Sequence, residues 1–176
     1  MSSFSRKINT QRGFTLFEML VVVFIIGIIV SFATLSVGNP GSDEVEEEIN
    51  RIQQLIRIAS EEAIFNAKEL ALEINNENYQ FVRLVDGNQW QPISDDNILR
   101  QRQFPTDIDV EILIDGLKVI IDDPDNPIRI FILSSGDVRP FVLKIKHHDA
   151  DDFYTLESDS SNKLTLLKPG QEADNG

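Results

Sequence analysis

Three residues near the N-terminus, Gly13, Phe14 and Glu18, have types and spacing that could support proteolysis followed by charge pairing. Glu18 lies just before an unbroken apolar run, Met19 to Val30. An unpaired carboxylate inside a membrane-spanning helix costs roughly 2.5–3.5 kcal/mol or more, so Glu18 is expected to have a partner. Cleavage between Gly13 and Phe14 would create a new amino terminus. The ammonium group on Phe14 of one copy could then neutralise Glu18 of another copy as their helices pack.

The apolar window from residue 14 to residue 37 predicts a helix that crosses a membrane. Its 24 residues correspond to about 36 Å of α-helix, which exceeds a hydrocarbon core of about 30 Å. The alternative is a secretory signal peptide, whose apolar core is usually only about 7–15 residues long. Ser31-Phe32-Ala33 resembles the cleavage site of such a peptide weakly. The length of the window and the position of Glu18 favour the membrane span.

The first thirteen residues carry three basic side chains and no acidic one: Arg6, Lys7 and Arg12. Because positive charge favours the cytoplasmic side of a membrane, residues 1–13 are expected to form a cytoplasmic leader. The chain beyond residue 37 is then expected outside the cytoplasm. This topology is that of a single-pass protein of the cytoplasmic membrane whose C-terminal domain lies on the outer side.

Composition narrows the range of functions. The 176 residues fit one modest domain with extensions. The formal net charge is −13, and removing residues 1–13 would take three of the 16 basic residues and none of the 29 acidic ones, leaving −16. Such acidity argues against nucleic-acid binding, which depends on Lys and Arg neutralising phosphates. The absence of cysteine excludes disulfides and thiol chemistry, so the core must stabilise the domain unaided.

Residues 42–75 are expected to form an amphipathic helix. Asn39-Pro40-Gly41 punctuates the end of the apolar window, and Asp43-x-x-Glu46 has the pattern of a capping box. Apolar residues then recur in steps of three or four: Val45, Ile49, Ile52, Ile56, Ala59, Ala63, Ala67 and Leu70. The stripe predicts a helix that packs on a sheet of its own domain, and the alternative is a stripe also shared with neighbouring subunits.

Residues 79–168 predict a β-rich domain. Short β-branched runs alternate with turn signals such as Asp86-Gly87-Asn88 and Asp115-Gly116. We expect about seven strands in two packed antiparallel sheets. The fold class is therefore α+β: a long N-terminal helix, part membrane span and part amphipathic, followed by a β-sandwich-like domain. Residues 169–176 are polar and are expected to form a flexible tail.

The residues expected outside the membrane offer little for catalysis or ligand binding. His147 and His148 are adjacent in a polar turn and, with nearby aspartates, could hold a metal, but their spacing matches no recognised ligand pattern. Asp122 to Pro127 is rich in oxygen donors for calcium but lacks the Gly and distal Glu of an EF-hand. Solvated loops are favoured at both places, and Trp90 is favoured as a packing residue. No nucleophile elbow or phosphate loop occurs, so we expect no enzyme, cofactor, metal or small-molecule substrate.

The N-terminal arrangement resembles the class III signal of type IV pilins and pseudopilins: a short basic leader, Gly at the cleavage site, Phe as the first mature residue and Glu four residues later. In such proteins a prepilin peptidase cuts after the position matching Gly13 and methylates the amine of the residue matching Phe14. Glu18 matches the carboxylate that pairs subunits during assembly.

Two stretches of the domain resemble the GspH/FimT-like minor pseudopilins. One runs from Tyr79-x-Phe81 through Asp86-Gly87-x-x-Trp90 to Phe104-Pro105, and the other is Ile130-Phe131-Ile132-x-Ser134-Ser135-Gly136-x-x-x-Pro140-Phe141. The acidic composition fits the secretion-type members better than the pilus-type members. The resemblance implies a pilin-like fold and a place near the tip of a periplasmic pseudopilus. It also implies partners among the I, J and K-type minor pseudopilins and the major pseudopilin, with inner-membrane lipid surrounding the helix before assembly.

Two other functions share parts of this pattern. A minor pilin of a type IV pilus, acting in adhesion or DNA uptake, would have the same leader, helix and fold. A membrane-anchored periplasmic enzyme or ligand-binding module would have an anchor that is never processed. The state of the N-terminus discriminates this last function from the other two.

Overall fold

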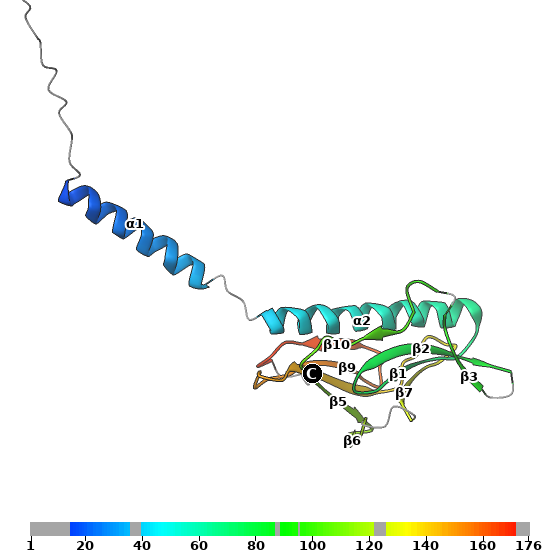
Figure 1. Cartoon of the computed structure of the whole chain (residues 1–176). Coiled ribbons are helices and arrows are strands. Elements are labelled where there is room, and N and C mark those ends of the chain that lie inside the picture. Colours follow the sequence, from blue (N-terminus) through cyan, green and yellow to red (C-terminus); the bar gives the residue numbers. More distant parts are fainter. Residues whose placement is uncertain (1–14, 36–39, 87–88, 95, 122–125, 172–176) are drawn as a thin grey trace, which may run out of the picture. The chain divides into compact units, whose positions relative to one another are not determined.

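The computed structural model describes residues 15–35, 40–86, 89–94, 96–121 and 126–171 of the chain. Within these ranges two helices precede ten strands (Figure 1). The chain divides into two compact units, Met1–Gly38 and Asn39–Gly176. The first unit contains α1 (Leu16–Leu35), and the second contains α2 (Pro40–Asn66) and the strands.

Helix α1 is apolar along its length and carries one charged residue, Glu18, in its first turn. No helix among the described residues meets the length and hydropathy required to cross a membrane. Residues 14, 36 and 37 of the window expected to form the span lie outside the described ranges.

The strands form two sheets in which neighbouring strands are antiparallel. Sheet A has the order β3-β2-β1-β7, with β4 also paired to β2, and sheet B has the order β10-β9-β8-β5-β6. The strands of sheet A are β1 (Leu70–Ile74), β2 (Asn78–Val85), β3 (Gln89–Pro92), β4 (Arg102–Gln103) and β7 (Ile128–Ile132). The strands of sheet B are β5 (Ile108–Ile114), β6 (Leu117–Val119), β8 (Phe141–His147), β9 (Tyr154–Ser158) and β10 (Leu164–Leu167).

Helix α2 lies along the strands and shares one hydrophobic core with both sheets (Figure 1). Its buried stripe matches the helical period expected from the sequence: Val45, Ile49, Ile52, Ile56, Ala59 and Ala63. Leu72 and Phe81 of sheet A and Leu143 and Leu156 of sheet B complete the same cluster. The expected α+β fold with two antiparallel sheets is therefore confirmed, and the stripe packs on sheets of its own domain.

The turn between β7 and β8 requires a glycine where it meets α2. Gly136 has a φ of +88°, and a Cβ added there would lie 2.5 Å from Ile64 Cδ1 on the helix. Asn162, in the turn between β9 and β10, accepts a hydrogen bond from the Val138 backbone N–H at 2.8 Å. The turn at Ser134 to Gly136 therefore packs against α2.

The expected bounds of the amphipathic helix, residues 42–75, were wrong at both ends. The helix begins at Pro40, where proline suits the first turn because its missing N–H has no intrahelical partner there. It ends at Asn66, because Ala67 adopts a positive φ of 48° and the N–H groups of Ala67 and Lys68 bond to the carbonyls of Ile64 and Ala63. This pair of bonds is a Schellman motif, normally built around glycine.

The remaining part of that segment, Leu70–Ile74, is strand β1. The sequence does not reveal it as a strand because all five of its residues are buried, so it lacks the alternation of a half-exposed strand. As the central strand of sheet A, β1 pairs with β2 on one side and β7 on the other. The short strands β3 and β4 were also missed, because their four and two residues are too few to show a period.

Replacing Ala67 with glycine tests the helix terminus. We expect Ala67→Gly to raise the free energy of unfolding by about 0.5–1 kcal/mol, because a Cβ is strained at positive φ. The shift in the urea midpoint of the full chain in detergent measures it. The same substitution at Ala63, inside the buried stripe, should lower the midpoint. A lower midpoint for Ala67→Gly would contradict the assigned terminus.

Candidate assembly site

Thr15 caps the N-terminus of α1. Its carbonyl accepts the first intrahelical hydrogen bond, from the N–H of Met19 at 3.2 Å. Its Oγ1 accepts a hydrogen bond from the N–H of Glu18, also at 3.2 Å. A threonine whose hydroxyl bonds to the third helical N–H is an N-cap, which stabilises a helix by about 1 kcal/mol. Thr15 therefore holds the first turn, including Glu18, in helical form.

Glu18 is exposed on this first turn. Among the described residues no ion pair or side-chain hydrogen bond is found for its carboxylate. The partial positive charge of a helix N-terminus favours an acidic group in this position. Gly13 and Phe14, the expected cleavage and methylation residues, lie outside the described ranges. Within the described residues, the structure thus shows an exposed, unpaired carboxylate in the first turn of an apolar helix.

The role of Thr15 was missed in the sequence, although a signal for it was present. Thr15-x-x-Glu18 has the threonine and glutamate spacing of a capping box. The box assigned to Asp43-x-x-Glu46 was wrong, because Asp43 lies inside α2 rather than before it.

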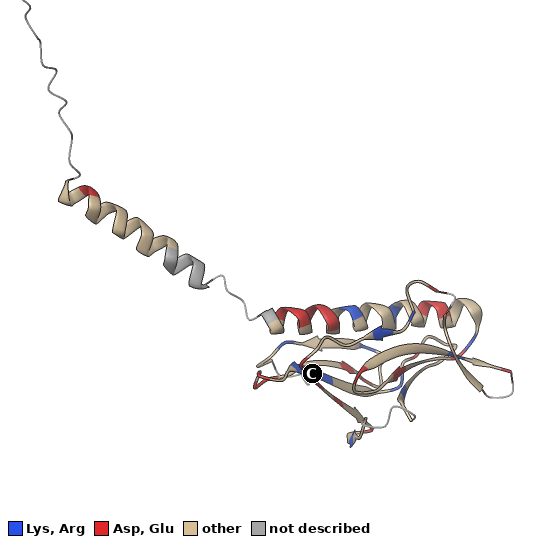
Figure 2. Cartoon of the chain, viewed as in Figure 1, with Lys and Arg blue, Asp and Glu red and all other residues tan. Residues whose placement is uncertain are grey.

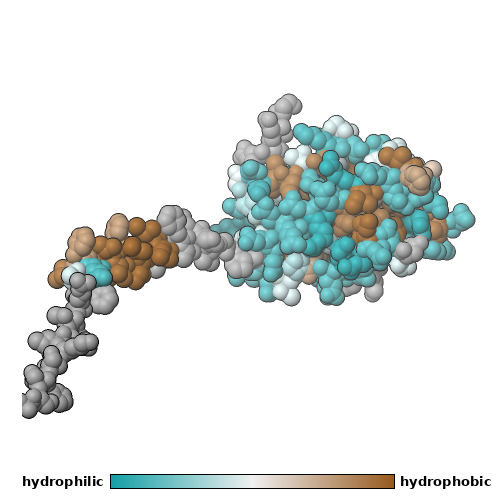
Figure 3. All heavy atoms as spheres, turned by 90° about the horizontal axis from the view of Figure 1, so that it is seen from above, coloured by the Kyte–Doolittle hydropathy of each residue, from teal (hydrophilic) through white to brown (hydrophobic). Residues whose placement is uncertain are grey.

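The apolar side chains of α1 from Leu16 to Ile29 are largely exposed (Figure 3). Leu16, Phe17 and Phe24, for example, are 84%, 74% and 65% exposed. Burying one such side chain fully is worth roughly 1.5–3 kcal/mol. This helix therefore gains free energy from any apolar environment that accepts it, whether a lipid bilayer or other helices.

A buried carboxylate links the N-terminal half of α2 to sheet A. Glu48 is only 3% exposed, and its Oε1 accepts a hydrogen bond from the Tyr79 hydroxyl on β2 at 2.6 Å. Its other oxygen forms an ion pair with Arg51 of the same helix. Burial and the bond to Glu48 raise the pKa of the Tyr79 phenol well above its ordinary value, so it remains a donor.

Glu46 forms the corresponding link to sheet B. Its Oε1 accepts a hydrogen bond from Lys168 Nζ at 2.6 Å, and its Oε2 accepts one from the Tyr154 hydroxyl on β9 at 3.2 Å. The bond from Lys168, supported by that from Tyr154, lowers the pKa of Glu46. Residues two apart in a helix point in different directions, so Glu46 and Glu48 lie on opposite sides of the buried stripe and contact different sheets. Figure 2 shows acidic residues concentrated on this first half of α2.

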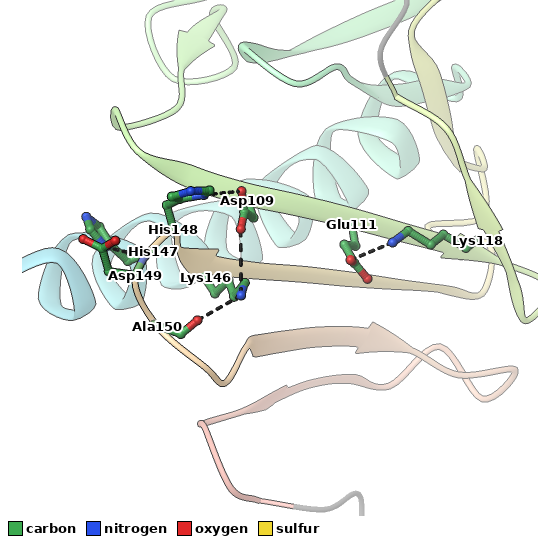
Figure 4. Close-up of polar contacts among 8 residues, drawn as sticks. All are labelled: Asp109, Glu111, Lys118, Lys146, His147, His148, Asp149 and Ala150. Atoms are coloured by element: carbon green, nitrogen blue, oxygen red, sulfur yellow. Dashed lines mark hydrogen bonds and ion pairs between the residues drawn. The ribbon is translucent and has the colours of Figure 1, made fainter.

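The two histidines make separate contacts near the turn after β8 (Figure 4). His148 Nδ1 lies 3.3 Å from Asp109 Oδ1, whereas His147 Nδ1 lies 3.9 Å from Asp149 Oδ2. No group of three or more potential metal ligands is found in the described part of the chain. Residues 122–125 of the other acidic loop lie outside it.

Trp90 has a packing role. Its ring lies 5.7 Å from the ring of Phe131, centroid to centroid, and the Arg129 guanidinium lies 5.8 Å from the Trp90 centroid. Arg129 in turn pairs with the buried Glu73 at 2.7 Å. The tryptophan therefore covers the outer face of sheet A.

The two tyrosine contacts allow a matched test of how α2 is held. We expect Tyr79→Phe to lower the free energy of unfolding by about 1–3 kcal/mol, because it removes a donor from a buried carboxylate. Tyr154→Phe should cost less, because Glu46 keeps Lys168 and is partly exposed. Urea denaturation of both variants of the full chain measures the difference. Equal losses would contradict the buried link.

Comparison with known proteins finds matches to the N-terminal segment and to the whole chain. The profile of the prokaryotic N-terminal methylation motif matches residues 8–34. Type II secretion system protein H of Aeromonas hydrophila is 28% identical over 178 residues, covering 93% of this chain and 97% of the relative. Its counterpart in Pseudomonas aeruginosa is 29% identical over 149 residues, covering 78% of this chain and 84% of the relative.

A solved structure shares the fold. The crystal structure of the minor pseudopilin EPSH from the type II secretion system of Vibrio cholerae has a TM-score of 0.64 and 24% identity. The match covers 74% of this chain and 98% of that structure. The N-terminal motif, the nearly full-length relatives and the shared fold agree, and the chain is similar over most of its length to type II secretion system protein H.

Proposed function

We propose that the chain is a minor pseudopilin: a structural subunit at or near the tip of the periplasmic pseudopilus of a type II secretion system, supporting export of folded proteins across the outer membrane. One observation carries this proposal. The similarity to type II secretion system protein H extends over 93% of this chain, so it includes both the N-terminal motif and the globular unit. Such relatives are components of secretion machinery, which favours a structural subunit over an enzyme.

Maturation prepares the subunit for assembly. Prepilin peptidase removes residues 1–13 at the cytoplasmic face and methylates the new amine of Phe14. The match of the methylation motif over residues 8–34 supports this step. Until assembly, α1 resides in the inner membrane and the globular unit in the periplasm. The exposed apolar side chains of α1 support this location.

Assembly then transfers α1 from lipid to a bundle of similar helices. The apolar side chains are satisfied in both environments, so burial alone gives little net drive. Glu18 biases the equilibrium, because a neighbour's N-terminal ammonium neutralises it in the bundle, whereas lipid offers no counter-ion. Its exposed position, with no partner found among the described residues, supports this pairing. The partners are other pseudopilins, with the I, J and K types and the major pseudopilin as the specific proposal.

Thr15 has a positioning role in this mechanism. Because its hydroxyl holds the Glu18 N–H, the first turn keeps its helical form directly beside the new terminus. The carboxylate is then presented in a fixed direction rather than on a frayed end.

The alternative function, a minor pilin of a type IV pilus, shares the leader, helix and fold. It is less favoured, because the relatives described above carry a type II secretion name. An acidic chain is also poorly suited to DNA uptake.

Intact mass tests maturation. The form purified from membranes of a host with the secretion system should lack residues 1–13 and carry one additional methyl group. Gly13→Ala should retain the leader and accumulate in the membrane. A wild-type chain that keeps its first thirteen residues while secretion proceeds normally would refute the proposal.

Substitution of Glu18 tests assembly. Glu18→Ala should leave membrane insertion unchanged and reduce incorporation into pseudopili by at least about tenfold, because the neighbour's ammonium would be buried unpaired. Incorporation is measured by crosslinking to other pseudopilins in sheared fibre fractions.

Thr15 supplies the matched control for this test. Thr15→Ala should reduce incorporation by about fivefold through loss of the cap, whereas Thr15→Ser retains a capping hydroxyl and should restore it. Normal incorporation of Glu18→Ala would contradict the pairing step, and equal behaviour of the two Thr15 variants would contradict the capping role.

A further inference from the structure

Strand β5 has one edge that is only partly paired. Along its whole length, Ile108–Ile114, it pairs with β8. On the opposite edge β6 pairs only with Ile112–Ile114. The N-terminal half of β5, residues 108–111, therefore has no strand beside it among the described residues.

The direction of the unpaired backbone groups follows from the ladder. The N–H of His148 donates to the carbonyl of Asp107 at 2.7 Å, so residues 107 and 148 form a hydrogen-bonded pair. Such pairs alternate with non-bonded ones along an antiparallel ladder, so Asp109 and Glu111 also direct their backbone groups toward β8. Ile108 and Val110 direct their N–H and C=O groups outward. No hydrogen bond is found for these outward groups within the described part of the chain.

A cavity of about 720 Å³ lies along this edge. Its lining combines apolar residues, among them Ile108, Val110 and Ile120, with charged residues of both signs. Ile120 is 78% exposed and Leu117 on β6 is 72% exposed. Unpaired strand edges flanked by exposed apolar residues invite another strand to pair, and globular proteins usually blunt them.

Acidic side chains restrict which strand can pair. Asp109 and Glu111 lie on the same side of β5 and line the cavity (Figure 4). Their present partners are partly exposed and leave carboxylate oxygens accessible. Lys146 Nζ lies 3.8 Å and His148 Nδ1 3.3 Å from Asp109, and Lys118, which is 62% exposed, contacts one oxygen of Glu111 at 2.6 Å. Both carboxylates therefore have capacity for a further cation.

A second copy of this chain is a poor occupant of the edge. If two copies of β5 paired in antiparallel fashion with both sheet faces continuous, odd-numbered residues would lie opposite odd-numbered residues. Asp109 would then face an acidic residue such as Asp109 or Glu111 of the other copy. Like charges directly opposite one another destabilise such a pair. The same arrangement favours a strand that places basic residues at those positions.

We propose that residues 108–111 of β5 are a strand-addition site for an extended segment of a different protein, in which Lys or Arg alternates with apolar residues. The segment forms backbone hydrogen bonds with Ile108 and Val110. Its basic side chains lie opposite Asp109 and Glu111, and its apolar side chains contact the wall near Ile120. This inference goes beyond the proposed function and does not depend on it.

A peptide titration tests the proposal. The full chain, isotopically labelled and held in detergent, is titrated with a short acetylated peptide of alternating lysine and valine, and the amide exchange of Ile108 and Val110 is followed by NMR. We expect slower exchange at these two amides and binding about tenfold tighter than for the glutamate–valine peptide. The double variant D109N/E111Q should lose that preference.

Two controls separate strand addition from charge attraction. The lysine–valine peptide with N-methylated backbone at alternate residues keeps its charge but cannot form the ladder, so it should bind at least about tenfold more weakly. The amide of Leu113, which is directed toward β8, is the internal reference, and its exchange should remain unchanged. Equal binding of the methylated peptide, equal binding of the acidic peptide, absence of binding, or protection of Ile108 by self-association alone would each overturn the proposal.

Discussion

The structure depends on one constraint: α1 is an exposed apolar helix that carries a carboxylate in its first turn. Each large apolar side chain gains roughly 1.5–3 kcal/mol on leaving water, so the helix must be accepted by lipid or by other helices. Glu18 opposes entry into either environment unless a cation accompanies it. In the proposed assembly, the apolar residues favour burial of α1, and Glu18 distinguishes lipid from a helix bundle that supplies a cation.

The globular unit meets a different requirement, which is to hold α2 in one position without disulfides. Apolar burial of the stripe from Val45 to Ala63 supplies most of the adhesion. It does not by itself prevent rotation or sliding, because apolar contacts are non-directional. Glu46 and Glu48 supply direction, since each accepts a hydrogen bond from a tyrosine in a different sheet. The N-terminal half of α2, which follows α1 in the chain, is the half that these glutamates hold.

The sequence predicted those features that depend on local periodicity. The stripe of α2 and the alternating strand β5 were found in this way, and the short leader motif indicated the family. Strand β1 could not be found, because burial on both faces removes the period. The end of α2 at Asn66 was missed because alanine rather than glycine occupies the positive-φ position. The hydrogen bond between Glu48 and Tyr79 joins residues 31 apart in the chain, so a local sequence pattern could not predict it.

The two proposed interaction surfaces would lie in different environments, so their charges would act differently. In the proposed helix bundle the dielectric is low, so an ion pair at Glu18 would be strong and little affected by salt, and charge would contribute to the affinity itself. At the edge of β5, water and salt screen Asp109 and Glu111, which are 42% and 31% exposed. Charge there selects among strands, while backbone hydrogen bonds and apolar contacts hold the one selected. An acidic chain can use both proposed surfaces, because each carboxylate can accept a further cation from a partner.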